Sequence, residues 1–139
     1  ASKRLLYRLA RAGEARLAVE VLGQMPQFRV AADAESYTLA GRACMRGGRP
    51  DLLEAVYRRY QRDERMEGPD RERWAHTVTT FLELFAKAVP RARGVPGGAA
   101  WDTREWAYRA YVLMLRSRRD FGLLFESSEP YMWLLRALG

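Results

Sequence analysis

The stretch that decides the fold is ESYTLAGRACMRGGRPDLLEAVYRRYQRDERMEGPD, residues 35–70. Gly47 and Gly48 interrupt it in the middle and Gly68-Pro69-Asp70 closes it, so both places are predicted turns. The apolar residues on either side of the central turn recur every three or four positions, as on one face of a helix. They are Tyr37, Ala40, Gly41, Cys44 and Met45, then Leu52, Leu53, Val56, Tyr57 and Tyr60. The stretch therefore predicts two antiparallel helices.

Related patterns flank this stretch on both sides. An offset of 35 residues matches it to the segment upstream, and an offset of 69 residues matches it to the segment downstream. Two short helices are marginal alone in water, so the recurrence predicts a stack of such hairpins that bury one another. The matched pairs are Arg11 with Arg46, Gly13 with Gly48, Leu17 with Leu52 and Val21 with Val56 upstream, and Tyr37 with Trp106, Met45 with Met114, Arg49 with Arg118, Asp51 with Asp120 and Val56 with Phe125 downstream.

The order of these landmarks resembles the pentatricopeptide repeat family, whose units run to 35 residues. The landmarks are Ser36-Tyr37-Thr38, the run from Cys44 to Asp51, a long amphipathic helix, and Pro69-Asp70. The Trp, Leu-Gly and Tyr landmarks of the 34-residue tetratricopeptide repeat are not found at their expected positions. The resemblance implies an all-α, right-handed stack of helical hairpins, a solenoid of three to four degenerate repeats.

The repeats are predicted to form a single domain over residues 1–139, with units of about 1–34, 35–70, 71–101 and 102–139. The third unit departs from the pattern, because one long helix over residues 71–89 is followed by a Pro/Gly-rich loop, 90–100, where a return helix is expected. Arg91 and Arg93 lie in this loop, which is either a mobile surface insertion or an arm that orders on RNA.

The first unit is predicted to contain a helix over residues 1–11 and a return helix over 14–25. Arg4, Arg8 and Arg11 share one stripe of the first helix, which is either a solvated face or a phosphate-contacting one. The apolar residues Leu5, Leu6 and Leu9 face elsewhere. Leu17, Val21 and Leu22 are predicted to be buried in the return helix.

The second unit is predicted to begin with Asp33 as the cap of its first helix, on which Arg42 and Arg46 repeat the four-residue spacing. Its return helix is expected over residues 50–62, with Pro50 in the first turn. Four arginines near the end of that helix would offset the helix dipole and need no ligand. They are Arg58, Arg59, Arg62 and Arg65.

The charge of the chain points to an acidic partner. The net charge is +7, and the basic residues are 22 Arg but only two Lys, Lys3 and Lys87. Nucleic acid is the commonest partner of such a protein. Arg suits phosphate better than Lys does, because its planar guanidinium can donate two hydrogen bonds to one phosphate. A GC-rich genome would produce the same bias, since Ala, Gly and Pro are also frequent, so both explanations stay open.

The sequence argues against catalysis, and we expect no enzyme activity, cofactor, metal site or small-molecule substrate. His76 has no partner in a recognisable nucleophile motif, and one His with one Cys cannot assemble a zinc set. The glycine runs lack the Lys-Ser/Thr of a phosphate loop. Cys44 is predicted to be a small core residue. No apolar run is long enough for a membrane span.

The family resemblance implies an organellar RNA-binding protein. In that family a residue in the first turn of each unit and the residue closing the unit read a base, and these are Thr38 and Asp70 in the second unit. The other units have Lys3, Ala75 and Ala107 at the first position, so phosphate-directed binding to structured RNA, as in an organellar ribosome, fits better than sequence-specific recognition. The expected RNA-binding residues are Arg4, Arg8, Arg11, Thr38, Arg42, Arg46, Asp70, Arg91, Arg93 and Arg109.

The alternative is a protein scaffold in a large organellar assembly such as a respiratory complex. The predicted last helix, 130–138, is apolar, and it is either a cap on the last repeat or a face that docks a neighbouring protein. The docking residues would be Tyr131, Trp133, Leu134 and Leu138. The resemblance favours the mitochondrial matrix over the plastid. No targeting segment is visible and the sequence begins without Met, so we expect a processed or partial product.

Overall fold

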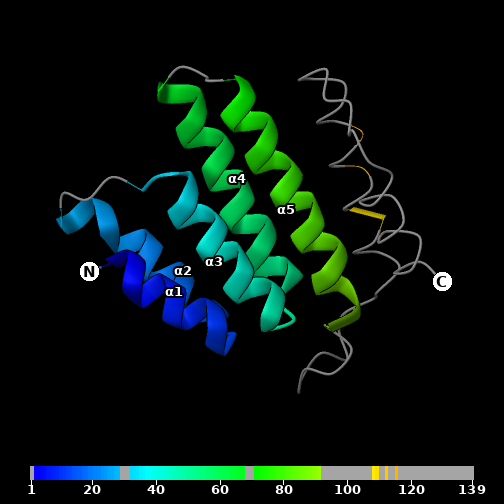
Figure 1. Ribbon diagram of the computed structural model, residues 1–139, viewed down its shortest axis with the longest axis horizontal. Helices are drawn as coiled ribbons and strands as arrows, with labels where there is room; N and C mark the ends of the chain where they lie inside the picture. The colour runs from blue at the N-terminus through cyan, green and yellow to red at the C-terminus, as the bar shows by residue number, and fades with distance from the viewer. Residues whose placement is uncertain are drawn as a thin grey trace.

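The computed structural model describes residues 2–28, 32–67 and 71–91, together with Tyr108, Arg109, Val112 and Leu115. These residues form α-helices and one short 3-10 helix, and no strand occurs among them. The elements are α1 (Ser2–Ala12), α2 (Ala15–Gln24), η1 (Met25–Phe28), α3 (Ala34–Arg46), α4 (Pro50–Glu67) and α5 (Arg71–Arg91). The all-α prediction is confirmed for this part of the chain (Figure 1). None of the described helices has the length and hydropathy needed to cross a membrane.

Helix α1 ends in a tight turn at Gly13, whose φ of 69° lies in the left-handed region that side chains disfavour. The Gly13 N–H donates to the Ala10 carbonyl at 3.3 Å, and the Glu14 N–H donates to the Leu9 carbonyl at 3.0 Å. This pair of reversed hydrogen bonds is the Schellman motif, which satisfies carbonyl groups left over at the end of a helix. The chain can then reverse directly into α2.

Helix α3 ends in the same way. Gly48 has a φ of 65°, its N–H donates to the Met45 carbonyl at 3.1 Å, and the Arg49 N–H donates to the Cys44 carbonyl at 2.9 Å. Each donor and acceptor lies 35 residues after its counterpart in the first turn. The 35-residue offset read from the sequence is thus present in the backbone of the two hairpins.

The two turns lie in direct contact. A Cβ atom on Gly47 would be 2.6 Å from the Gly13 carbonyl oxygen, and one on Gly13 would be 3.3 Å from the backbone of Arg46. In addition, Arg46 Nη1 donates to the Arg11 carbonyl at 3.2 Å, across an interval of 35 residues. That carbonyl is one of those that the Schellman motif leaves without a helical partner. The backbones approach so closely that only glycine fits at position 47.

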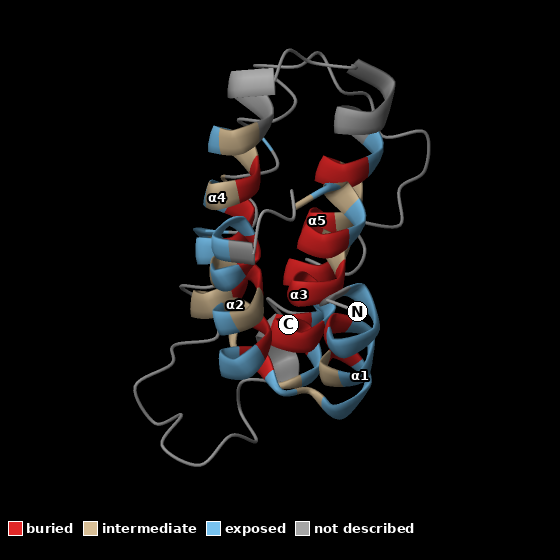
Figure 2. Ribbon diagram, turned by 90° about the vertical axis from the view of Figure 1, so that its left-hand side faces the viewer, coloured by how far each residue is buried: buried red, intermediate tan, exposed pale blue. Residues whose placement is uncertain are grey.

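The helices form two layers. Helix α3 packs between α1 and α5 in one layer, while α2 and α4 contact each other in the second layer, behind α3 (Figure 1). Buried residues of α4 and α5 face each other, and α3 is buried along most of its length (Figure 2). The two layers therefore enclose a single core, with the outward face of α1, α3 and α5 exposed.

Aromatic side chains fill the part of the core between α4 and α5. Tyr57 lies 5.2 Å from Phe81 and 6.1 Å from Phe85 between ring centroids, and Tyr60 stacks on Phe81 at 5.8 Å. All four side chains are almost completely buried. Such contacts add roughly 0.5–1.5 kcal/mol each beyond the area they bury.

The predicted core of the second unit is correct. Tyr37, Ala40, Gly41, Cys44, Met45, Leu53, Val56, Tyr57 and Tyr60 are buried, and Leu52 packs partly buried against them. Burial raises the pKa of the Cys44 thiol to about 12, as expected for a small core residue.

The predicted core of the first unit is partly wrong. Leu22 is buried as expected and Val21 is partly buried, but Leu17 is 48% exposed. On α1, Leu6 is buried whereas Leu5 is 46% exposed. The interior of this hairpin is instead formed by small residues, Ala10, Ala15 and Ala18. Helical periodicity identified the apolar positions, but no described unit covers the outer side of α1 and α2.

Two predicted helix ends are also corrected. Helix α4 continues to Glu67 instead of ending near Arg62, and α5 continues through Pro90 to Arg91 instead of ending at residue 89. No stop signal precedes Gly68 in the first case. In the second, only Arg91 follows Pro90 in α5, so the disruption that a proline causes is confined to the last turn.

Replacing Gly13 or Gly48 by alanine should destabilise the protein by about 1–2 kcal/mol, because both residues have a positive φ. Gly23→Ala is the matched control. Gly23 lies inside α2, where a Cβ would meet only the end of the Arg59 side chain at 3.4 Å. This variant should gain up to about 1 kcal/mol from helix propensity. Urea unfolding would measure all three, and equal losses would contradict the assigned role of the turns.

Candidate nucleic-acid interface

Arginines from two successive hairpins meet at the C-terminal ends of α1 and α3. Arg11 from α1 and Arg42 and Arg46 from α3 line one depression of 310 Å³. Its remaining lining residues are Tyr7, Ala10 and Leu39. We call Tyr7, Arg11, Arg42 and Arg46 the basic surface. The contact between the two turns produces it, because that contact places the ends of α1 and α3 side by side.

A second depression, of 590 Å³, adjoins the first. Arg11 and Arg46 line both, and Lys87 from α5 is added in the second. The other residues of the second depression are Ala12, Gly13 and Met45. Among the described residues, no Asp or Glu lines either depression. Arg11, Arg42 and Arg46 can therefore attract an anion without first breaking an ion pair within the described part of the chain.

The side chains of the basic surface are held in part by contacts within α1 and between α1 and α3. Arg46 donates to the Arg11 carbonyl, and the Arg11 guanidinium carbon lies 6.0 Å from the centre of the Tyr7 ring. Cations in the last turn of a helix also offset its dipole, which is a structural reason for Arg11 and Arg46. Arg42 lies one turn earlier, so the dipole explains it less well.

Magnitudes indicate that the dipoles do not cancel this charge. A helix C-terminus carries about half a negative charge, so two such ends contribute roughly one. Arg11, Arg42 and Arg46 contribute three positive charges at the same place. About two positive charges remain unbalanced there.

Arg4 and Arg8 are exposed on α1. Neither forms an ion pair with a carboxylate in the part of the chain that the structure describes. They lie on the same stripe of α1 as Arg11, but earlier along the helix, and neither is among the lining residues of the two depressions. They extend the positive charge of α1 but do not line the depressions.

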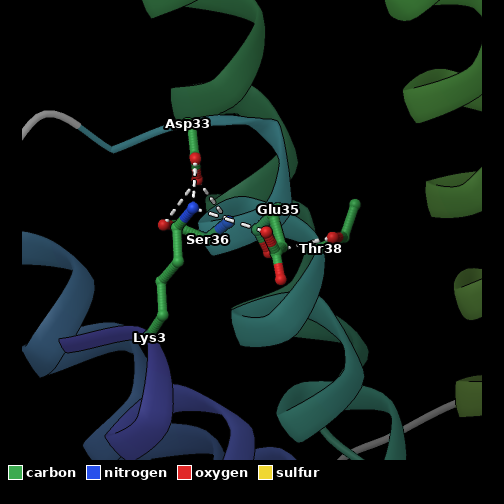
Figure 3. Close-up of polar contacts among 5 residues, drawn as sticks. All are labelled: Lys3, Asp33, Glu35, Ser36 and Thr38. Atoms are coloured by element: carbon green, nitrogen blue, oxygen red, sulfur yellow. Dashed lines mark hydrogen bonds and ion pairs between the residues drawn. The ribbon is translucent and has the colours of Figure 1, made fainter. Parts of the chain in front are cut away.

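The predicted base-reading position of the second unit is engaged within its own helix. The Thr38 hydroxyl donates to the Glu35 carbonyl at 2.9 Å (Figure 3). At the matching position of the first unit, the Lys3 ammonium lies 2.6 Å from Asp33 and 3.4 Å from Glu35. The N-terminal ends of α1 and α3 therefore carry paired charges, unlike their C-terminal ends.

Asp33 caps α3, as predicted. Its carboxylate accepts hydrogen bonds from the Ser36 N–H at 3.0 Å and the Ser36 hydroxyl at 2.8 Å. Burial alone would raise the pKa of Asp33, but the hydrogen bonds from Lys3 and Ser36 outweigh it and lower the pKa below the ordinary 3.8. The hydrogen bonds to Asp33 and Glu35 raise the pKa of Lys3.

Arg109 lies apart from the basic surface. Its guanidinium is 3.6 Å from Glu54 on α4, and both residues line a separate depression in the second layer. Arg58 also pairs with Glu54, at 2.5 Å. The structure thus places Arg109 with the return helix and not with Arg11.

The arginines of α4 form ion pairs along the helix. Arg59 and Arg62 lie 4.0 Å and 3.5 Å from Asp63. Asp63 also accepts a hydrogen bond from the Tyr37 hydroxyl, and burial raises the pKa of that phenol. Because α4 continues to Glu67, Arg58 and Arg59 lie in its middle. The prediction that they offset its C-terminal dipole was wrong for these two.

Several predicted site residues lie outside the described residues or side chains. Arg91 is the last residue of α5, and its side chain is not described. The same applies to the side chain of Arg65. The others outside the description are Asp70, Arg93, Tyr131, Trp133, Leu134 and Leu138.

Sequence reasoning missed two residues of this region, Tyr7 and Lys87. Tyr7 lies four residues before Arg11, a spacing that brings a ring and a guanidinium together on a helix. That signal was present in the sequence. Lys87 offered none, because its position beside Arg46 depends on how α5 packs against α3.

Within the described part of the chain, no three His, Cys, Asp or Glu side chains come together in a way that could hold a metal ion. No protein-family model, curated protein or solved structure matches this chain. The chemistry of the basic surface is therefore the principal guide to function.

The two roles of Asp33 can be separated by two substitutions. Asp33→Ala removes the cap and should cost about 1 kcal/mol, whereas Asp33→Asn keeps a good cap and should cost little. The lowered pKa means that ionised Asp33 contributes stability above about pH 4, which is lost as the pH falls through the folded-state value. The Asn variant should lack this part of the acid dependence in urea unfolding between pH 2 and 6. An unchanged acid profile would show that the ionised carboxylate of Asp33 gains no stability from its contacts with Lys3 and Ser36.

Proposed function

We propose that this chain is a non-catalytic RNA-binding protein whose basic surface contacts the phosphate backbone, and that its hairpins continue as a right-handed solenoid. One observation carries the proposal. Three arginines from two successive hairpins converge on one depression, and no described carboxylate lies in its lining. Such an arrangement suits a polyanion that passes from one hairpin to the next.

Arginine suits phosphate because its planar guanidinium offers several donors in a fixed fork. The half-exposed Tyr7 ring beside Arg11 offers a face on which an unpaired base can stack. Phosphate contacts position the RNA, and the stacking contact accepts any base. The expected binding is therefore strongly salt-dependent and nearly independent of sequence.

Two contacts support binding without base reading. The Thr38 hydroxyl already donates within its helix, and Lys3 is paired with two carboxylates. Neither side chain is set up to discriminate a base edge. An organellar ribosome is the assembly that best suits a phosphate-directed protein of this kind, and its assignment to the mitochondrial matrix rests on the pentatricopeptide resemblance alone.

A scaffold role in a large assembly is the second candidate. The observation that favours it is the exposed apolar side of the first hairpin, where Leu5 and Leu17 are each nearly half exposed. The paired charges of α4 give that layer little free charge for RNA. The two candidates use different surfaces and can be tested separately.

Replacing Arg11, Arg42 and Arg46 together by glutamine should weaken the binding of single-stranded RNA by orders of magnitude at low salt. Each lost phosphate contact should reduce the slope of log K against log salt by about 0.7, so three should reduce it by about 2. Fluorescence anisotropy with a labelled mixed-sequence oligonucleotide over a salt series measures both quantities. Glutamine keeps the helix propensity near that of arginine, which limits effects on folding.

The matched control replaces Arg16, Arg58 and Arg62 by glutamine. These arginines are exposed on α2 and α4, and their removal lowers the net charge by the same three units. The control should retain nearly the full salt slope. If both triple variants lose the same affinity and slope, the charge acts as a diffuse field and the assigned surface is wrong.

A further inference from the structure

The outer side of the first hairpin is an apolar face that no described residue covers. It is formed by Leu5 and Leu9 on α1 and by Leu17 and Val21 on α2, and we call these four residues the N-terminal face. Leu5 and Leu17 are 46% and 48% exposed, and the other two are partly buried. Figure 2 looks onto this side of the molecule, where α1 and α2 show mainly exposed and intermediate residues.

The second hairpin shows what the equivalent face does when it is covered. An offset of 35 residues converts the N-terminal face into Ala40, Cys44, Leu52 and Val56. Ala40 and Cys44 are completely buried, Val56 is 2% exposed, and Leu52 is partly buried. The first hairpin thus exposes the side that serves as a packing interface in the second.

A further hairpin stacked in the same manner does not fit this face. The position equivalent to Gly47 is Ala12. A Cβ at position 47 would lie 2.6 Å from the carbonyl oxygen of the preceding turn, and Ala12 has such a Cβ. The Cβ of Ala12 would clash with the backbone of such a preceding turn, and backbone cannot move aside as a flexible side chain can. A partner of the N-terminal face must therefore pack in a different arrangement from the one that joins the first and second hairpins.

The N-terminal face is complementary to itself. The hairpin reverses at Gly13, so Leu9 and Leu17 are equidistant from the turn, as are Leu5 and Val21. A twofold axis parallel to the helices would place α1 of one copy over α2 of the other at the same level. Leu9 would then meet Leu17, and Leu5 would meet Val21, in two apolar layers of a four-helix bundle.

The exposed charges beside this face agree with the same arrangement. Arg8 is exposed on α1 and Glu20 is exposed on α2. With a rise of about 1.5 Å per residue, the two lie within about 3 Å of the same level in the paired helices. Arg8 of each copy therefore comes near Glu20 of the other. The positive charge of Arg8 on α1 would thus lie opposite the carboxylate of Glu20 on α2 of the other copy.

We propose that two copies of this chain associate through the N-terminal face, with α1 of one copy packed on α2 of the other about a twofold axis. The association is independent of RNA binding, because the basic surface lies on the side of α1 that faces α3. It would orient two basic surfaces within one particle.

Sedimentation equilibrium of the wild-type protein, without RNA, should show a monomer–dimer equilibrium. Leu5→Glu and Leu17→Glu should each weaken dimerisation by at least tenfold, because a carboxylate would be buried in the interface. Leu115→Glu is the matched control, since Leu115 is exposed to a similar extent, 42%, and does not belong to the face. Circular dichroism would verify that each variant retains its helices.

A charge exchange tests the twofold arrangement itself. Arg8→Glu and Glu20→Arg should each weaken the dimer by placing like charges together, and the double variant should recover most of the lost affinity. A wild-type protein that stays monomeric over the whole concentration range overturns the proposal. It is equally overturned if the dimer survives Leu5→Glu and Leu17→Glu, or if the double exchange gives no recovery.

Discussion

The contact between two successive turns is the constraint on which the rest of this structure depends. The Gly13 carbonyl lies against Gly47, at a distance that leaves no room for a side chain. The left-handed glycines in both turns allow the chain to reverse within a few residues. As a result α1 and α3 end at the same edge of the first layer, and the arginines of their last turns are brought together. The recurrence of the same turn therefore places equivalent arginines, Arg11 and Arg46, next to each other.

The two layers differ less in the number of their arginines than in whether those arginines form ion pairs with carboxylates. On α4, acidic residues within one turn neutralise Arg58, Arg59 and Arg62, and such exposed pairs contribute little to stability. At the ends of α1 and α3 the described lining contains no such residue. Amino-acid composition could not have shown this difference. The difference depends on where Asp and Glu lie relative to the arginines on each helix.

Much of the local structure could be predicted from the sequence. Glycine at equivalent positions, Asp33 before a helix and Pro50 at the start of another are signals that act within a few residues, and each prediction is confirmed. The exposure of Leu17 could not be predicted in this way. Periodicity identifies an apolar face, but whether that face has a neighbour depends on its place in the stack.

The candidate site could be predicted only in part, because it also depends on how the helices pack against one another. The four-residue spacing of Arg42 and Arg46 placed both on one helix, and the 35-residue offset placed Arg11 beside Arg46. Arg109 is also among the expected RNA-binding residues, but in the structure it pairs with Glu54 on α4. Long-range packing decides such cases, and it leaves no local signal in the sequence.

The most direct test of the account is to observe the arginine side chains while RNA binds. In a nitrogen-15 NMR titration with single-stranded RNA, the Nε–H signals of Arg11, Arg42 and Arg46 should shift together with the backbone amides near Gly13 and Gly48. The signals of Arg58 and Arg62 should stay in place. Shifts confined to α4, or spread evenly over all arginines, would contradict the assignment of RNA binding to the basic surface.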